Sequence, residues 1–435
     1  MYKTVIGLLV LILTLSNCST TDSHPNIILI MADDLGYGDI GCYGNKLILT
    51  PNIDAMAKSG IKFTDYHSNG AVCSPTRAAL LTGCYQQRAG IEGVVTAAKH
   101  RVGGLDPEII TIADVAKEQG YTTAIFGKWH VGYDTAHSPV KNGFDEYRGF
   151  VSGNIDYHSH IDQSGAFDWW NGTDTLVEEG YLTDLITEHA IDFIGRNANN
   201  PFFLYLPHGA PHYPYQGRND KADRTVNGKF NNGGSRIDRD AAYKEMIEVM
   251  DEGVGRIMKS IRENGIEENT LVFFCSDNGS VPNLGSNGVL KGSKATLWEG
   301  GHRVPAIMWF PEKFEQAENA DLLLSMDLLP TFAKLMGNKD LDKLNLDGID
   351  LIANLNNNLP DNRIAYWRFN QFAVARQGEW KFLRHKDQDY LFNLDKDIGE
   401  TQNLKDFEPE ILKTLKDSMA RWEEEMGQYS YFTGR

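Results

Sequence analysis

The apolar residues of the chain fall into short runs that alternate with amphipathic stretches. Five runs are almost continuous in apolar residues, and they begin at Asn26, Thr122, Phe202, Thr270 and Pro305. Runs of this kind are typical of strands that are buried on both faces of a sheet. Residues 241–264, by contrast, place their apolar side chains on one helical stripe. Because strands alternate with helices, we expect an α/β fold with a large, mainly parallel central sheet flanked by helices.

The pattern changes after about residue 338. Residues 363–394 contain short runs of β-type residues joined by polar turns, and a helical pattern follows from Pro409. We therefore divide the folded part of the chain into a main domain at residues 25–337 and a C-terminal subdomain at residues 338–435. The smaller unit is expected to be an antiparallel sheet with one helix.

The first residues differ from the rest of the chain. Lys3 precedes an eleven-residue apolar run from Val5, which is too short to cross a bilayer. We interpret residues 1–24 as an export signal and a short linker. The segment LSNC resembles a bacterial lipobox, in which Cys18 would carry a lipid. We therefore expect an exported protein, either free in the periplasm of a bacterium or a lipoprotein that touches the membrane only through Cys18.

The charge of the chain limits its partners. The formal net charge is −17, from 42 lysines and arginines against 59 aspartates and glutamates. This excess of negative charge argues against a nucleic-acid partner or an anionic membrane surface. An anionic substrate must therefore be met by a local cluster of cations.

The cysteines do not form a recognisable scaffold. They are five in number, at positions 18, 42, 73, 84 and 275, and no C-x-x-C pair occurs. A zinc site is therefore not expected, and the cysteines are too few to staple a chain of this size. A bond between Cys42 and Cys84 remains open.

Polar residues follow each of four buried runs. In chain order they are Asp33 and Asp34, then Lys128 and His130, then His208 and His212, then Asp277 and Asn278. In open α/β sheets ligands bind beyond the carboxyl ends of the strands, so these side chains should converge on one site. Singly, each pair could be no more than a turn.

The residue types narrow the chemistry of this site. Three carboxylates and one amide oxygen form a hard, all-oxygen set that suits Ca²⁺ or Mg²⁺ better than zinc or copper. Such a cation beside Arg77, Lys128 and Lys294 would make a pocket for an oxyanion. Phosphoryl and sulfuryl esters both fit this description.

The segment C-S-P-T-R at residues 73–77 resembles the signature of the type I sulfatases, within the alkaline-phosphatase superfamily. Further segments resemble blocks of that family in family order, at residues 26–39, 127–132, 208–212, 276–280, 294–305 and 380–404. The resemblance covers nearly all of the mature chain and points to a secreted bacterial carbohydrate sulfatase. It implies that a separate maturating enzyme, which recognises Pro75 and Arg77, oxidises Cys73 to formylglycine. A helix downstream would offer its N-terminus to a bound anion.

The resemblance also implies a role for each residue of the site. One calcium ion would be held by Asp33, Asp34, Asp277, Asn278 and residue 73. The aldehyde of residue 73 would add water, and one of the two hydroxyls would give its proton to Asp277 and attack sulfur. Arg77 would hold the hydrated aldehyde, while Lys128 and Lys294 would bind sulfate oxygens. His212, assisted by Lys294, would protonate the leaving sugar oxygen, and His130 would deprotonate the second hydroxyl to expel sulfate.

The expected substrate is a sulfated mono- or oligosaccharide. A segment rich in sugar-binding residue types offers Asp156, Tyr157, His158, His160, Trp169 and Trp170, and a predicted loop adds His100 and Arg101. Ordinary loop packing explains these residues equally well. The sequence does not identify the sugar or the position of its sulfate. It also does not show whether sulfate is removed from chain ends or from chain interiors.

Two alternatives remain. One is a phosphatase or phosphodiesterase of the same superfamily, although its members typically use Ser or Thr and two transition metals. The other is a catalytically silent protein that binds sulfated glycans through an unmodified Cys73. The relative rates on phosphate and sulfate esters distinguish a phosphatase from a sulfatase. The chemical state of residue 73 distinguishes a silent binding protein from an enzyme.

Overall fold

The computed structural model describes residues 24–228, 233–355, 363–430 and 432. The predicted export signal and Cys18 lie outside these residues. Within the described part of the chain, no helix has the length and apolar character needed to span a membrane. Cys42, Cys73, Cys84 and Cys275 are free thiols, so the bond between Cys42 and Cys84 that the sequence left open is not formed here.

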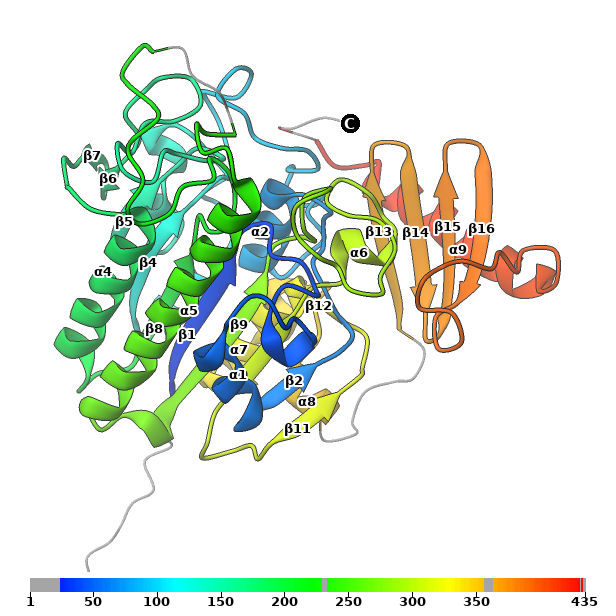
Figure 1. Cartoon of the computed structure of the whole chain (residues 1–435). Coiled ribbons are helices and arrows are strands. Elements are labelled where there is room, and N and C mark those ends of the chain that lie inside the picture. The colour runs from blue at the N-terminus through cyan, green and yellow to red at the C-terminus, as the bar shows by residue number, and fades with distance from the viewer. Residues whose placement is uncertain (1–23, 229–232, 356–362, 431, 433–435) are drawn as a thin grey trace, which may run out of the picture.

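A ten-stranded sheet forms the centre of the molecule (Figure 1). Its middle consists of five parallel strands, in the spatial order β9 (Thr270–Ser276), β1 (Asn26–Ala32), β8 (Phe202–Pro207), β4 (Thr122–Lys128) and β5 (Glu146–Phe150). Four of them are the apolar runs that the sequence predicts to be buried strands. The fifth predicted run forms β10 (Ala306–Trp309), which is antiparallel to β9. The predicted mainly parallel α/β fold is therefore confirmed.

Short strands complete the two edges of this sheet. Beyond β10 lie β2 (Ile61–Phe63) and β11 (Ala317–Asn319), and beyond β5 lie β6 (Trp170–Asn171) and β7 (Asp174–Thr175). A separate pair is formed by β3 (Tyr66–His67) and β12 (Leu323–Leu324).

Helices cover both faces of the central sheet. One face carries α1 (Pro51–Lys58), α4 (Leu182–Asn197) and α5 (Arg239–Glu263), and the other carries α2 (Cys73–Thr82), α3 (Ile112–Glu118) and α7 (Leu328–Leu335). Two shorter helices are α6 (Glu299–His302) and α8 (Leu351–Leu355).

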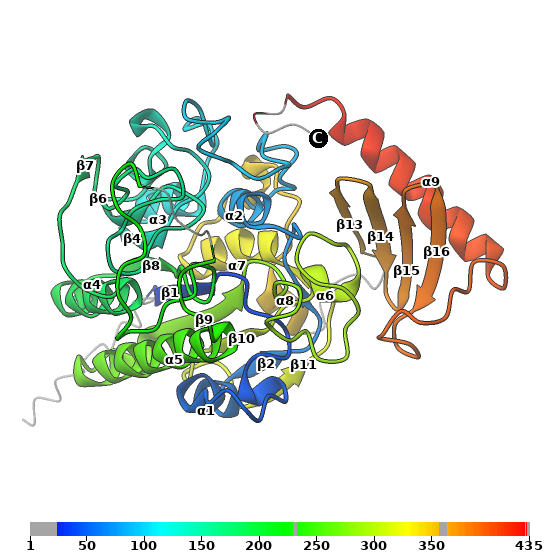
Figure 2. The same ribbon diagram turned by 45° about the horizontal axis from the view of Figure 1, so that its top comes forward.

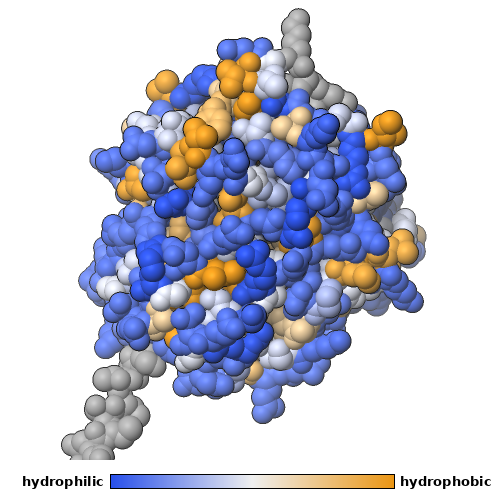
Figure 3. Space-filling view, turned by 60° about the vertical axis from the view of Figure 1, so that its left-hand side comes forward, coloured by the Kyte–Doolittle hydropathy of each residue, from blue (hydrophilic) through white to orange (hydrophobic). Residues whose placement is uncertain are grey.

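Strand β1 explains why both faces are covered. Ile28 and Ile30 pack with α4 and α5, whereas Ile27 and Leu29 pack on the opposite side. Successive side chains of a strand point to opposite faces, so a continuous apolar run needs a cover on each side. The side of the molecule that carries α4 is mainly hydrophilic, with scattered apolar patches (Figure 3). The apolar stripes of these helices are thus turned toward the sheet.

A second, smaller sheet lies beside the first (Figure 2). It is a four-stranded antiparallel meander, followed by one long helix. Its elements are β13 (Ile364–Phe369), β14 (Phe372–Gln377), β15 (Trp380–His385), β16 (Gln388–Asn393) and α9 (Pro409–Met426). The apolar cluster between this sheet and α9 also includes Ala71 and Ala79 of the main domain. The small sheet therefore shares part of its core with α2.

Buried charges link the two sheets. Asp65 next to β3 accepts two hydrogen bonds from Arg376 of β14, at 2.8 and 2.6 Å. Lys381 of β15 donates to Glu299 at 2.9 Å. The two histidines of this network, His67 and His302, are fully buried, and their Nδ1 atoms lie 2.9 Å apart. One Nδ1 must donate and the other accept, so the two rings cannot both be doubly protonated and keep this bond.

Acid is expected to destabilise this junction. Burial lowers the pKa of His67 below its ordinary 6.5, and that of His302 far below it. Below about pH 6.5 the unfolded chain therefore binds more protons than the folded chain. The free energy of unfolding then falls as the pH falls, by about 1.4 kcal/mol per pH unit for each extra proton that the unfolded chain binds. Denaturant unfolding over a pH series measures this slope. His302→Gln should reduce it, and an unchanged slope in that variant would contradict the assignment.

Candidate active site

Polar side chains from four neighbouring strands meet at one edge of the central sheet. Asp33 and Asp34 follow β1, and Asp277 and Asn278 follow β9. The backbone N–H of Asp34 donates to Asp277 Oδ1 at 3.1 Å, and Asn278 Nδ2 donates to Asp34 Oδ1 at 2.7 Å. All four residues are fully buried. The structure thus brings together residues that are more than 240 positions apart in the sequence.

Each carboxylate of this cluster is paired with a cation. Lys128, the last residue of β4, donates to Asp33 Oδ2 at 2.6 Å, and Lys294 donates to Asp34 Oδ1 at 2.5 Å. Arg77 of α2 donates to Asp277 Oδ2 at 2.7 Å. Arg77 also donates to the backbone oxygen of Lys128 at 3.1 Å, which ties α2 to the end of β4. The three cations therefore balance the three carboxylates one for one.

Cys73 is the first residue of α2, and it is buried. This corrects the sequence analysis, which places the helix downstream of the cysteine. Proline is compatible with the first turn of a helix, so Pro75 does not prevent α2 from beginning at Cys73. Thr76 Oγ1 accepts a hydrogen bond from the backbone of Gly70 at 3.1 Å and fixes the preceding loop. Burial raises the pKa of the Cys73 thiol, against the opposing effect of Lys128 and Lys294.

The cluster fits a hard metal ion. Ligand atoms of Asp33, Cys73 and Asp277 lie within 4.8 Å of one another. Two buried oxygens, Asp33 Oδ1 and Asn278 Oδ1, have no hydrogen-bond partner among the described residues. Buried polar atoms are rarely left without a partner, and oxygen atoms of this kind suit Ca²⁺.

Two histidines face the same region with fixed ring orientations. His130 Nε2 lies 2.8 Å from the Val95 oxygen and must donate to it, which leaves Nδ1 as an acceptor. This Nδ1 is buried and has no partner in the described part of the chain. His212 Nδ1 donates to the Tyr213 oxygen at 2.8 Å, and its Nε2 lies 3.6 Å from Asp34 Oδ2. His130 has a φ of 58°, a strained value that is common at functional sites.

His208 does not belong to this group. Its ring is fully buried, does not line the cavity described below, and has no hydrogen-bond partner among the described residues. Burial lowers the pKa of His208 to about 4, so the ring is neutral. We regard it as a packing residue.

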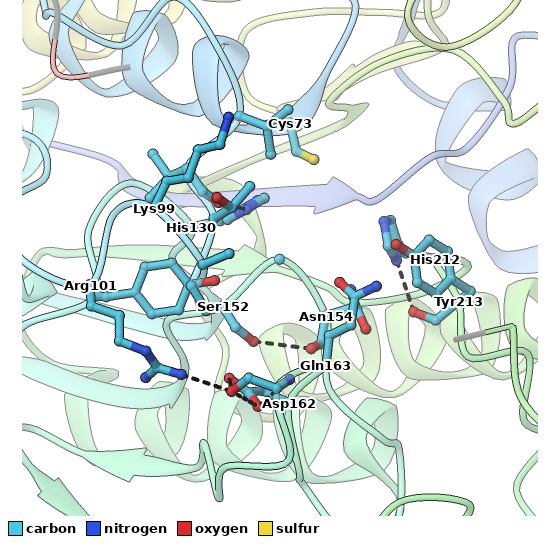
Figure 4. Close-up of a pocket in the computed structure, with 18 of the residues that line it drawn as sticks. Cys73, Lys99, Arg101, His130, Ser152, Asn154, Asp162, Gln163, His212 and Tyr213 are labelled. Atoms are coloured by element: carbon cyan, nitrogen blue, oxygen red, sulfur yellow. Dashed lines mark hydrogen bonds between the residues drawn. The ribbon is translucent and has the colours of Figure 1, made fainter. Parts of the chain in front are cut away.

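A cavity of about 1120 Å³ opens over these residues (Figure 4). Cys73, His130, His212 and Lys294 line its inner part. The remaining wall comes from loop 94–102 together with Tyr133, residues 152–154, residues 162–164, Tyr213 and Val281. Sequence reasoning missed most of this wall, including Lys99, Asn154 and Gln163. These loop positions follow no motif and no strand end, so no sequence signal marks them.

The predicted sugar-binding segment lies mostly away from this cavity. Tyr157, His160 and Trp169 are buried in the protein, and His160 stacks on Trp169. Asp156 is also buried, and its carboxylate accepts backbone hydrogen bonds from His158 and Ser159 of its own loop. The segment is therefore held together by its own contacts.

Two less buried residues of the segment also have internal partners. His158 contacts the Gly217 oxygen at 3.1 Å, and Trp170 donates to Asp168 at 2.6 Å. None of the six predicted residues from Asp156 to Trp170 lines the cavity. Their placement corrects the sequence-based expectation that they bind the sugar there. Of the other two candidates, Arg101 lines the cavity and His100 packs against Phe432.

Known proteins are similar to this chain over most of its length. The family model described as Sulfatase matches residues 25–338. N-acetylgalactosamine-6-sulfatase of Canis lupus familiaris is 35% identical, over 82% of this chain and 71% of its own length. Human arylsulfatase A is 33% identical, over 90% of this chain and 86% of its own length.

Solved structures show a similar fold. The crystal structure of Ps i-CgsB in complex with k-i-k-neocarrahexaose superposes with a TM-score of 0.85 at 32% identity, over 94% of this chain and 95% of that chain. A phosphonate monoester hydrolase of Agrobacterium radiobacter shares the fold at a TM-score of 0.62 and 19% identity, over 92% of this chain and 96% of that chain. The similarity thus extends over both sheets.

Proposed function

The chain belongs to the sulfatase family and is a sulfuric ester hydrolase, and we propose that it removes sulfate from a sulfated carbohydrate by means of a formylglycine made from Cys73 and a calcium ion. One observation carries this proposal. Cys73, the first residue of the C-S-P-T-R segment, is buried at the start of α2 beside the Asp33 and Asp277 carboxylates. A maturating enzyme would have to act on Cys73 before the site closes around it.

Calcium would be held by the oxygens of Asp33, Asp34, Asp277 and Asn278 and by residue 73. When bound, it would neutralise the clustered carboxylates and polarise the oxygens that it contacts. The two orphaned oxygens of Asp33 and Asn278 support this assignment. Asp33 and Asp34 would then share their charge between the ion and their present partners, Lys128 and Lys294.

Side chains of the protein would bind the sulfate group and transfer the protons of the reaction. Lys128 and Lys294 reach the site from two directions and would bind sulfate oxygens as negative charge develops on them. Arg77, which donates to Asp277 at 2.7 Å, would orient residue 73, and the Asp277 carboxylate would receive its proton. His130 Nδ1, which has no hydrogen-bond partner among the described residues, would accept the proton of the second hydroxyl. His212 lies across the cavity from His130 (Figure 4), with its Nε2 3.6 Å from Asp34 Oδ2.

A carbohydrate substrate is supported by the cavity and by the relatives. The cavity of about 1120 Å³ exceeds the range of about 300–1,000 Å³ that is typical of small-molecule sites. One relative is named for N-acetylgalactosamine 6-sulfate, and one structural neighbour was solved with a neocarrahexaose. The predicted N-terminal export signal would bring the enzyme to such substrates outside the cytoplasm.

Matched esters test this function. The matured protein should release sulfate from members of a panel of sulfated mono- and oligosaccharides, and phosphate from the corresponding phosphate esters far more slowly. Ca²⁺ should raise the melting temperature by a few degrees, because binding to the folded state alone stabilises it. Asn278→Ala should reduce this rise and the exposed Asn200→Ala should keep it. Faster phosphate release, or stabilisation by Zn²⁺ and not by Ca²⁺, would contradict the proposal.

A further inference from the structure

The outer wall of the cavity carries two cations that the catalytic cluster does not use. Lys99 and Arg101 are both exposed, and both line the cavity. The Lys99 ammonium has no hydrogen-bond or ion-pair partner in the part of the chain that the structure describes. Arg101 donates to Ser164 Oγ at 2.9 Å and leaves the rest of its guanidinium open. In a chain with a net charge of −17, two cations on one cavity wall favour an anionic ligand.

This wall carries one carboxylate against its two cations. Asp162 also lines the cavity, but its carboxylate accepts hydrogen bonds from Ser164 Oγ at 2.7 Å and from the backbone of Ala166 at 2.9 Å. No ion pair joins Asp162 to either cation among the described residues. The wall therefore keeps a local excess of positive charge.

The loop that carries the cations is fixed at one end by the catalytic site. His130 Nε2 donates to the Val95 oxygen at 2.8 Å. Within the loop, the backbone of Thr96 donates to His100 Nδ1 at 2.9 Å, which closes a tight turn before Arg101. These hydrogen bonds therefore hold the first part of the loop, from Val95 to His100, against the catalytic histidine.

Phe432 contacts the other end of this loop. The Phe432 ring packs against His100 with a centroid distance of 5.3 Å. The backbone of Phe432 donates to the Gly90 oxygen at 2.7 Å. Gly103 has a φ of 97°, and a Cβ there would lie 2.5 Å from the Phe432 ring. The loop therefore packs against Phe432, which follows α9 in the chain.

We propose that Lys99 and Arg101 form a second anion subsite, which binds a sulfate or carboxylate group on a neighbouring residue of an oligosaccharide whose reacting sulfate lies at the catalytic cluster. Phe432 is the positioning residue for this subsite. The inference rests on the proposed function, because it takes the inner cavity as the place of sulfate removal. It narrows the substrate class to oligosaccharides with at least two anionic groups.

The test compares oligosaccharides that differ only in the second anion. The wild-type enzyme should give a higher kcat/KM for a disulfated disaccharide than for the monosulfated one. In the Lys99→Ala/Arg101→Ala variant this ratio should fall about tenfold, which equals about 1.4 kcal/mol, mainly through KM. Lys99→Arg should preserve the ratio. A monosulfated disaccharide with a uronic acid shows whether a carboxylate can replace the second sulfate.

The test has a matched control, and two kinds of negative result are distinguished. Lys259→Ala removes a lysine near the far end of α5 and should leave the ratio unchanged. If the wild type releases no sulfate from any sugar, the proposed function fails. If it hydrolyses both disaccharides with equal kcat/KM, or if the double variant keeps the wild-type ratio, only the second subsite is overturned.

Phe432→Ala tests the positioning role. The ratio of kcat/KM between the disulfated and monosulfated substrates should fall severalfold, because the loop loses the ring on which His100 leans. Phe407→Ala removes a phenylalanine whose side chain is 76% exposed and should keep the ratio. An equal loss on both substrates in Phe432→Ala, together with a lower melting temperature, would assign Phe432 a purely structural role.

Discussion

Replacing Cys73 with alanine is expected to reduce sulfate release by about 10⁴-fold or more, because removal of a nucleophile abolishes the covalent route. The fold should survive this change. Cys73 makes no disulfide, and alanine suits the first turn of α2. The melting temperature should therefore stay close to that of the wild type, while sulfate release from a sulfated sugar disappears.

The thiol itself is a poor candidate for the nucleophile. Cys73 is buried, and burial raises the pKa of its thiol, so an unmodified cysteine would be mainly protonated. Mass spectrometry of the peptide that contains residue 73 should detect the aldehyde in active protein and the thiol in protein made without a maturating enzyme. Activity should follow the fraction of aldehyde.

Cys42→Ala is the matched control. Cys42 is a free, partly buried thiol outside the cavity lining, so its replacement should leave sulfate release unchanged. Full activity in Cys73→Ala, or full activity in protein whose residue 73 is entirely cysteine, would refute the proposed chemistry.

The sequence predicts the centre of the fold well because its strands have two buried faces. Continuous apolar runs such as the one in β1 leave few alternatives, and the polar residues that follow them must gather at one edge of a parallel sheet. That rule is enough to place Asp33 near Asp277. The antiparallel C-terminal sheet is also predicted, since its short runs of β-type residues are separated by polar turns, although its number of strands is not.

The outer part of the site could not be predicted in the same way. Aromatic residues such as Trp169 suit both sugar binding and packing, and only the folded loop shows that Trp169 is buried against His160. Lys99 is the opposite case. Nothing in the sequence distinguishes it from other exposed lysines in loops, and only the folded structure shows that it lines the cavity. The contact between His67 and His302 could not be predicted either, because neither residue directly follows one of the buried apolar runs.

Replacing His212 with alanine should produce the second largest loss, about 10²- to 10⁴-fold for a sugar sulfate, the usual contribution of a general acid or base. The ring orientation supports this role. His212 Nδ1 is engaged with the Tyr213 oxygen, so only Nε2 can exchange a proton with a bound ester. Burial lowers the pKa of His212 well below its ordinary value, and the Asp34 carboxylate, 3.6 Å from Nε2, opposes this effect and would favour a proton there.

The leaving group distinguishes proton donation from simple positioning. A sugar alkoxide is a poor leaving group and needs a proton, whereas a nitrophenolate leaves without one. His212→Ala should therefore slow a nitrophenyl sulfate far less than a sugar sulfate. His158→Ala removes a partly buried histidine that does not line the cavity, and it should affect neither substrate.

Lys294 is the competing proton donor in this site. It binds the same Asp34 carboxylate and lines the same cavity. If His212→Ala slows both sulfates equally, His212 does not donate the proton, and Lys294→Ala should then show the dependence on leaving group. If both variants are insensitive to the leaving group, neither residue is the acid, and the proton must reach the sugar oxygen from another group.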